Sequence, residues 1–173
     1  MLSQDYLVRI MVQFAEIIRR SWMRATKEHD PRGAADMLED AVGQATDIDG
    51  GVLLSLSPES IASVMQVSGI DPRVTEYIAR SLLLASGYLR EAGDHGLATV
   101  REQQARAIAE AYGHELPETP EELASLLEGL DEDGVEEVEL PLDTMGFDVP
   151  PLAVSSPIVL EDTHNPTAEK DRI

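Results

Sequence analysis

Residues 82–105 read LLLASGYLREAGDHGLATVREQQA, and this stretch decides the fold. Up to Leu89, apolar residues recur every three or four positions, which is the period of a helix with one buried face. Gly93-Asp94 then turns the chain, and a second apolar stripe runs from Leu97 to Tyr112. Two helices joined by so short a turn pack against each other in antiparallel orientation. The stretch therefore predicts a helical hairpin.

Helix starts of one kind recur on both sides of this hairpin. A capping side chain is followed by proline, whose fixed backbone angle suits the first helical position. The predicted starts and helices are Asp30-Pro31 with a helix to about Thr46, Ser57-Pro58 with a short helix to Gly69, Asp71-Pro72 with a helix to Gly93, and Thr119-Pro120 with a short helix to Leu127. Residues 47–51 are interpreted as a helix stop followed by a Gly-Gly turn.

The N-terminal segment, residues 3–27, predicts a strongly amphipathic helix that begins with Ser3 as its cap. One broad arc of this helix holds Leu7, Ile10, Met11, Phe14, Ile17, Ile18, Ser21 and Ala25. The opposite side holds four cations, Arg9, Arg20, Arg24 and Lys27. A solvated face explains these cations, since positive charge is favourable near a helix C-terminus. Alternatively, they bind an acidic segment, with the neighbouring Trp22 and Met23 as an apolar contact.

The hairpin resembles a tetratricopeptide unit, in which small residues let two antiparallel helices approach closely. The residues that carry the resemblance are Leu82, Ala85, Leu89, Gly93, Ala98 and Ala105. Ala34, Leu38 and Ala41 fit the second helix of another such unit, with residues 3–27 as its first helix. The two units lie further apart than the ~34 residues of a tandem array, so the resemblance implies an interrupted arrangement.

The opening residues Gln4-Asp5-Tyr6-Leu7, with Arg9-Ile10 and Gln13-Phe14, resemble the signature of an uncharacterised bacterial family of small tetratricopeptide-like proteins. The resemblance extends over residues 3–112. It implies a helical fold and brings no activity with it.

The acidic residues gather in the C-terminal third of the 173-residue chain, whose formal net charge is −20. Residues 107–169 carry 17 acids and no Lys or Arg. We therefore expect an all-α domain of five or six helices over residues 1–129, and an acidic, proline-containing tail over residues 130–173 that is disordered or docks in extended form.

Composition excludes several classes of chemistry. The chain has no cysteine, which excludes disulfides, thiolate zinc sites and cysteine nucleophiles. Its histidines show no metal-binding spacing, and no carboxylate pair is singled out by position, so we expect no metal, no cofactor and no catalytic residue. The charge of −20 opposes nucleic-acid binding. Without a signal peptide or an apolar span, a cytoplasmic protein is expected.

The sequence thus predicts a non-catalytic interaction or scaffold module, in which a groove between hairpins receives a peptide or helix. The candidate partner-binding residues are Arg9, Arg20, Trp22, Arg24 and Lys27. The candidate partners are an acidic protein segment and the chain's own tail. Two other interpretations remain open: a structural homo-oligomer packed through the first helix, and a hydrolase that uses carboxylates and a divalent metal ion.

Overall fold

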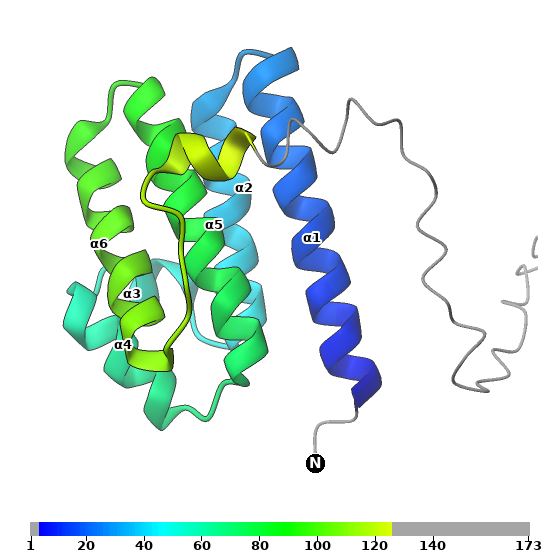
Figure 1. Ribbon diagram of the computed structural model, residues 1–173, viewed down its shortest axis with the longest axis vertical. Helices are drawn as coiled ribbons and strands as arrows, with labels where there is room; N and C mark the ends of the chain where they lie inside the picture. The colour runs from blue at the N-terminus through cyan, green and yellow to red at the C-terminus, as the bar shows by residue number, and fades with distance from the viewer. Residues whose placement is uncertain (1–3, 126–173) are drawn as a thin grey trace, which may run out of the picture. The chain divides into compact units, whose positions relative to one another are not determined.

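The computed structural model describes residues 4–125, and this part of the chain is helical and contains no strand. Figure 1 shows six labelled helices: α1 (Gln4–Lys27), α2 (Pro31–Thr46), α3 (Gly50–Leu54), α4 (Pro58–Val67), α5 (Pro72–Glu91) and α6 (His95–Tyr112). A further helix begins at residue 120 and continues to 125. The predicted all-α class is confirmed. The predicted domain boundary at residue 129 and the acidic tail lie outside the described residues.

The predicted helix starts are confirmed because each cap satisfies a backbone N–H that the first helical turn leaves without a partner. The side chain of Asp30 accepts from the Gly33 N–H at 2.9 Å, and Ser57 accepts from the Ser60 N–H at 3.3 Å. Asp71, Asp94 and Thr119 cap α5, α6 and the helix at 120–125 in the same way.

The interpretation of residues 47–51 as a helix stop followed by a glycine turn is confirmed for the stop and wrong for the turn. Asp47 does end α2 in a left-handed conformation, with a φ of 53°. Asp49, however, caps a new helix by accepting from the Val52 N–H at 3.0 Å, and Gly50 and Gly51 form its first turn. Glycine is needed at 43 because a Cβ there would lie 2.9 Å from the Gly50 Cα, and a Cβ on Gly50 would in turn lie 3.2 Å from the Gly43 Cα. The two backbones touch there.

The central helix of the bundle is α5, which packs against α6, α2 and α1 (Figure 1). Because neighbours cover several of its sides, every residue from 81 to 86 is buried, so burial in this part of α5 is not confined to one face. The α1 helix lies at one side of this layer, and Phe14 stacks on Tyr77 of α5 with ring centroids 6.1 Å apart.

Two helix pairs, α1 with α2 and α5 with α6, form the expected hairpins. The small residues of the second helices are buried, as close approach requires: Ala34 and Ala41 in α2, and Ala98 and Ala105 in α6. The helix at 120–125 crosses α5, where buried Pro120 packs on Gly87. None of the helices within residues 4–125 combines the length and the apolar character that crossing a bilayer requires.

Candidate functional site

Arg24 forms a half-exposed ion pair with Asp30 of the same chain. Its Nε lies 2.8 Å from the Asp30 Oδ2, so the pair links the end of α1 to the cap of α2. The hydrogen bond from the Gly33 N–H, together with that from Arg24, lowers the pKa of Asp30 below its usual value. Arg24 therefore belongs to the α1–α2 connection, whereas the sequence predicted it as a partner-binding residue.

Trp22, which the sequence also predicted as a partner-binding residue, is buried. Its side chain is only 6% exposed, whereas the adjacent Met23 is 38% exposed. Trp22 sits at the edge of the apolar arc of α1 and faces inward, so packing is its role. Of the two neighbours, only Met23 is accessible to another molecule.

The other predicted cations, Arg9, Arg20 and Lys27, are exposed on α1. None of them forms an ion pair with another residue of the range 4–125, and the same is true of Arg19. All other arginines of this range are paired: Arg24, Arg32, Arg73, Arg80, Arg90, Arg101 and Arg106. The four unpaired cations of the described chain therefore all lie on one helix.

Apolar side chains accompany these cations. Val8 and Val12 lie one turn apart on α1 and are 55% and 51% exposed. At helical spacing, Arg19 and Met23 continue the same strip. We call the set Val8, Arg9, Val12, Arg19, Arg20, Met23 and Lys27 the outer face of α1. This face combines a hydrophobic strip with four unpaired cations, and exposed Glu16, one turn from both Val12 and Arg20, is the one carboxylate of residues 8–27.

A groove borders the outer face along the seam between α1 and α2. Its larger part has a volume of about 240 Å³, with Ile10, Phe14 and Ala41 among the lining residues and Arg9 at one side. A smaller part, of about 150 Å³, shares Ile10 with the first and extends to the turn between α4 and α5. The small alanines of α2 leave this groove open beside a cation.

A polar groove of about 640 Å³ lies elsewhere, between α2, α3 and α6. Its most buried polar residue is Arg101, which donates from Nε and Nη2 to the two carboxylate oxygens of Glu39 at 2.8 and 3.2 Å. Arg101 Nη1 donates to the Leu54 carbonyl at 2.8 Å and to Gln104 Oε1 at 3.1 Å. Because Arg101 donates only to groups of the fold, this network links α2, α3 and α6. Both carboxylate oxygens of Glu39 accept hydrogen bonds from Arg101.

Sequence reasoning missed this network because its partners come from distant positions. Arg101 and Glu39 are 62 residues apart, and Arg101 occurs on a helix where a cation is ordinarily solvated. The one available signal was Gln104, one turn later, since two polar residues at that spacing share a face.

A second cluster of ion pairs links α5 to α6. Glu102 accepts from Arg90 at 2.9 Å and from Arg106 at 3.2 Å. Partial burial favours the neutral acid, but the hydrogen bonds from the two arginines hold the pKa of Glu102 below its usual value. Over residues 4–125, no group of three or more potential ligands is placed to hold a metal ion.

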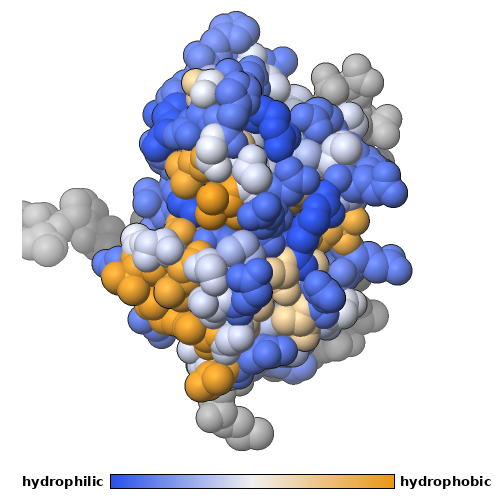
Figure 2. Space-filling view, turned by 90° about the vertical axis from the view of Figure 1, so that its left-hand side faces the viewer, coloured by the Kyte–Doolittle hydropathy of each residue, from blue (hydrophilic) through white to orange (hydrophobic). Residues whose placement is uncertain are grey.

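An apolar patch lies away from α1, on the face formed by α3, α4 and α6. Figure 2 shows apolar surface gathered on this side of the molecule. The large exposed apolar residues on these three helices are Val52, Val67 and Val100, at 60%, 90% and 37% exposure. The described chain therefore has two exposed apolar regions, and only the one on α1 is accompanied by unpaired cations.

Comparisons of the chain with protein-family models, with curated proteins and with solved structures find no match.

Proposed function

We propose that the protein is a non-catalytic interaction module whose outer face of α1 binds an acidic segment of a protein partner. The observation that carries the proposal is the charge arrangement: every arginine of the described chain outside α1 is paired, while Arg9, Arg19, Arg20 and Lys27 are not. In a chain with net charge −20, such a local positive strip attracts an acidic ligand that the rest of the surface repels.

The partner's chemistry follows from the two parts of the face. Exposed ion pairs contribute only about 0–1 kcal/mol each, so carboxylates alone bind weakly and lose affinity in salt. Burial of apolar surface, at about 25 cal/mol per Å², supplies most of the binding free energy. A segment with apolar side chains on Val8, Val12 and the α1–α2 groove, and with carboxylates beside them, matches both parts.

We further propose that the two hairpins are tetratricopeptide-like units separated by α3 and α4, in accord with the QDY-type family that the N-terminus resembles. The buried small residues Ala34 and Ala98 at corresponding places in the second helices support this assignment. Interaction modules of this type bind peptides along helix surfaces.

The test uses a labelled 16-residue peptide of leucine and glutamate, and a second peptide with lysine in place of glutamate. Fluorescence anisotropy measures their binding to the full chain and to the variant Arg9→Gln/Arg20→Gln. We expect the acidic peptide alone to bind, and the variant to bind it about fivefold more weakly, since two exposed ion pairs are lost. The matched control, Arg32→Gln/Arg73→Gln, removes the same charge from paired surface arginines and should bind as the wild type does. Equal binding by both variants would contradict the proposal.

A structural homo-oligomer is the second candidate, and the apolar patch of Val52, Val67 and Val100 favours it. Exposed apolar side chains gathered on one side of a molecule mark interaction sites in many proteins. Sedimentation of the wild type against Val52→Ser/Val67→Ser tests it: a dimer that the substitutions dissociate supports an oligomer, and a monomeric wild type rejects it.

A further inference from the structure

One segment of the chain combines acidic and apolar side chains, as the proposed ligand of the outer face of α1 does. Residues 128–136, EGLDEDGVE, carry five carboxylates and no cation. Leu130 and Val135 are interspersed among them, so apolar and acidic side chains occur together. Within residues 107–169 there is no Lys or Arg with which these acids could pair locally.

The segment begins three residues after the end of the described chain, which places it within reach of α1. The helix at 120–125 lies at the end of the bundle where α1 ends (Figure 1), and its Ala124 lines a cavity with Tyr88 and Glu91 of α5. Eleven residues span up to about 36 Å when extended. Along α1, the distance from Lys27 to Arg9 is about 27 Å, because a helix rises about 1.5 Å per residue.

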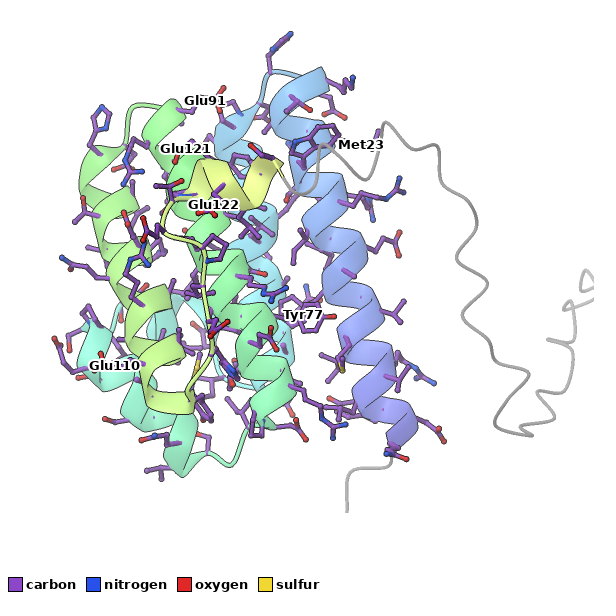
Figure 3. The ribbon with its side chains drawn as sticks, viewed as in Figure 1. Met23, Tyr77, Glu91, Glu110, Glu121 and Glu122 are labelled. Carbon is purple, nitrogen blue, oxygen red and sulfur yellow. The ribbon has the colours of Figure 1, made fainter. Side chains whose placement is uncertain are left out.

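Electrostatics at this end of the bundle direct the segment towards α1. Figure 3 shows Glu91 and Glu121 at the same end of the molecule as Met23. Both glutamates are exposed and repel further carboxylates, and Arg90 beside them is paired with Glu102. The unpaired cations of the C-terminal half of α1 are Arg19, Arg20 and Lys27.

We propose that residues 128–136 bind the outer face of α1 in the same chain and compete with an acidic partner for it. This inference rests on the proposed function, because the same cations serve both ligands. A segment joined by so short a tether has an effective concentration of about 1 mM, so even a weak intrinsic affinity keeps the face occupied. The face then opens only to a partner that binds more tightly than the tethered segment.

The experiment compares the full chain with the variant Asp131→Asn/Glu132→Gln/Asp133→Asn, using the leucine–glutamate peptide. Neutralising the segment should raise the affinity for the peptide about fivefold, as expected when a competitor of weak affinity at about 1 mM is removed. The matched control, Glu59→Gln/Glu110→Gln/Glu115→Gln, changes the net charge equally at exposed glutamates without ion pairs and should bind as the wild type does.

The outcomes separate the two proposals. The wild type and the neutralised chain could bind the peptide with equal affinity, and Arg9→Gln/Arg20→Gln could weaken that binding in both. This result would support the proposed function and overturn the inference about residues 128–136. If no form binds the peptide, the proposed function fails, and a second measurement that needs no partner decides the inference.

That measurement exploits Lys27, the one lysine within the described residues. A carbodiimide joins a lysine amine directly to a carboxylate in contact with it. The reaction is run at low salt on a mixture of isotope-labelled and unlabelled chains, so that links within one chain differ in mass from links between chains. We expect mass spectrometry to find Lys27 linked to acids of residues 128–136 of the same chain. Failure to find these links, or their occurrence between chains only, would overturn the inference.

Discussion

Pro120 lies against Gly87 so closely that a Cβ on Gly87 would be 2.8 Å from the Pro120 Cβ. The contact fixes the helix at 120–125 on α5 through a position that has no side chain. Since no real Cβ tolerates such a distance, one of the two helices must move when a methyl group is added.

Gly87→Ala should therefore destabilise the protein by about 1–3 kcal/mol in urea unfolding, despite the higher helix propensity of alanine. Gly96→Ala in α6 is the matched control, because a Cβ there meets no atom within 4 Å. That control should be neutral or stabilising by up to about 1 kcal/mol. In a Pro120→Gly background, which lacks the Cβ that the new methyl group would meet, Gly87→Ala should cost less, and an unchanged cost would show that the strain arises elsewhere.

Arg101→Leu should cost about 3–5 kcal/mol in unfolding free energy, because it leaves the partly buried Glu39 carboxylate without its donor and removes one of the two donors to the Leu54 carbonyl. Arg73→Leu removes an exposed pair with Asp71 and should cost no more than about 1 kcal/mol. A double-mutant cycle with Glu39→Gln checks the assignment. Additive effects of the two substitutions would mean that the side chains do not interact.

Asp30 should make stability depend on pH. Its folded pKa is lowered by the Gly33 N–H and Arg24, so its stabilisation is complete above about pH 5 and is lost as the pH falls below about 4. Asp30→Asn keeps a capping oxygen but no charge, and its melting temperature should lie between those of the wild type and Asp30→Ala.

The melting temperatures of the wild type and Asp30→Asn should converge as the solution is acidified from pH 7 to pH 3, while that of Asp30→Ala, which lacks the capping oxygen, should stay below both. Asp40→Asn, at an exposed position on α2 without an ion pair, is the control and should follow the wild type. A constant difference between wild type and Asp30→Asn over this range would contradict the role of the charge.

Substitutions of the adjacent residues Trp22 and Met23 should have different effects on stability. Trp22→Ala should cost about 3 kcal/mol or more, while Met23→Ala should leave stability nearly unchanged, because the first side chain is buried and the second is partly exposed. The fluorescence of Trp22, the only tryptophan, should shift to shorter wavelength when the urea-unfolded chain refolds. An unchanged spectrum would place the indole in water.

The helix boundaries could be predicted from sequence because their causes are local. A cap such as Asp30 or Asp71 and the proline beside it act within one turn, and an apolar stripe identifies the buried face. The five-residue helix α3 was missed because it is too short to show periodicity, and its glycines imitate a turn.

The candidate site could be predicted only in part, because pairing depends on distant residues. The basic stripe of α1 was visible, and Arg9, Arg20 and Lys27 are exposed as expected. The sequence alone did not reveal that Arg24 is bound by Asp30 across a turn. It likewise did not reveal that Arg19, off the stripe, is the fourth cation without an ion pair among the described residues.

The contact between Gly43 and Gly50 limits which substitutions the chain can accept at these two positions. A side chain at either position would push α2 and α3 apart, so the two glycines should be lost or kept together among related chains. A relative in which either glycine is replaced should carry a compensating insertion in the connection 47–49, which turns the chain between them. The close approach of α2 and α3 thus restricts the side chains that positions 43 and 50 can accept.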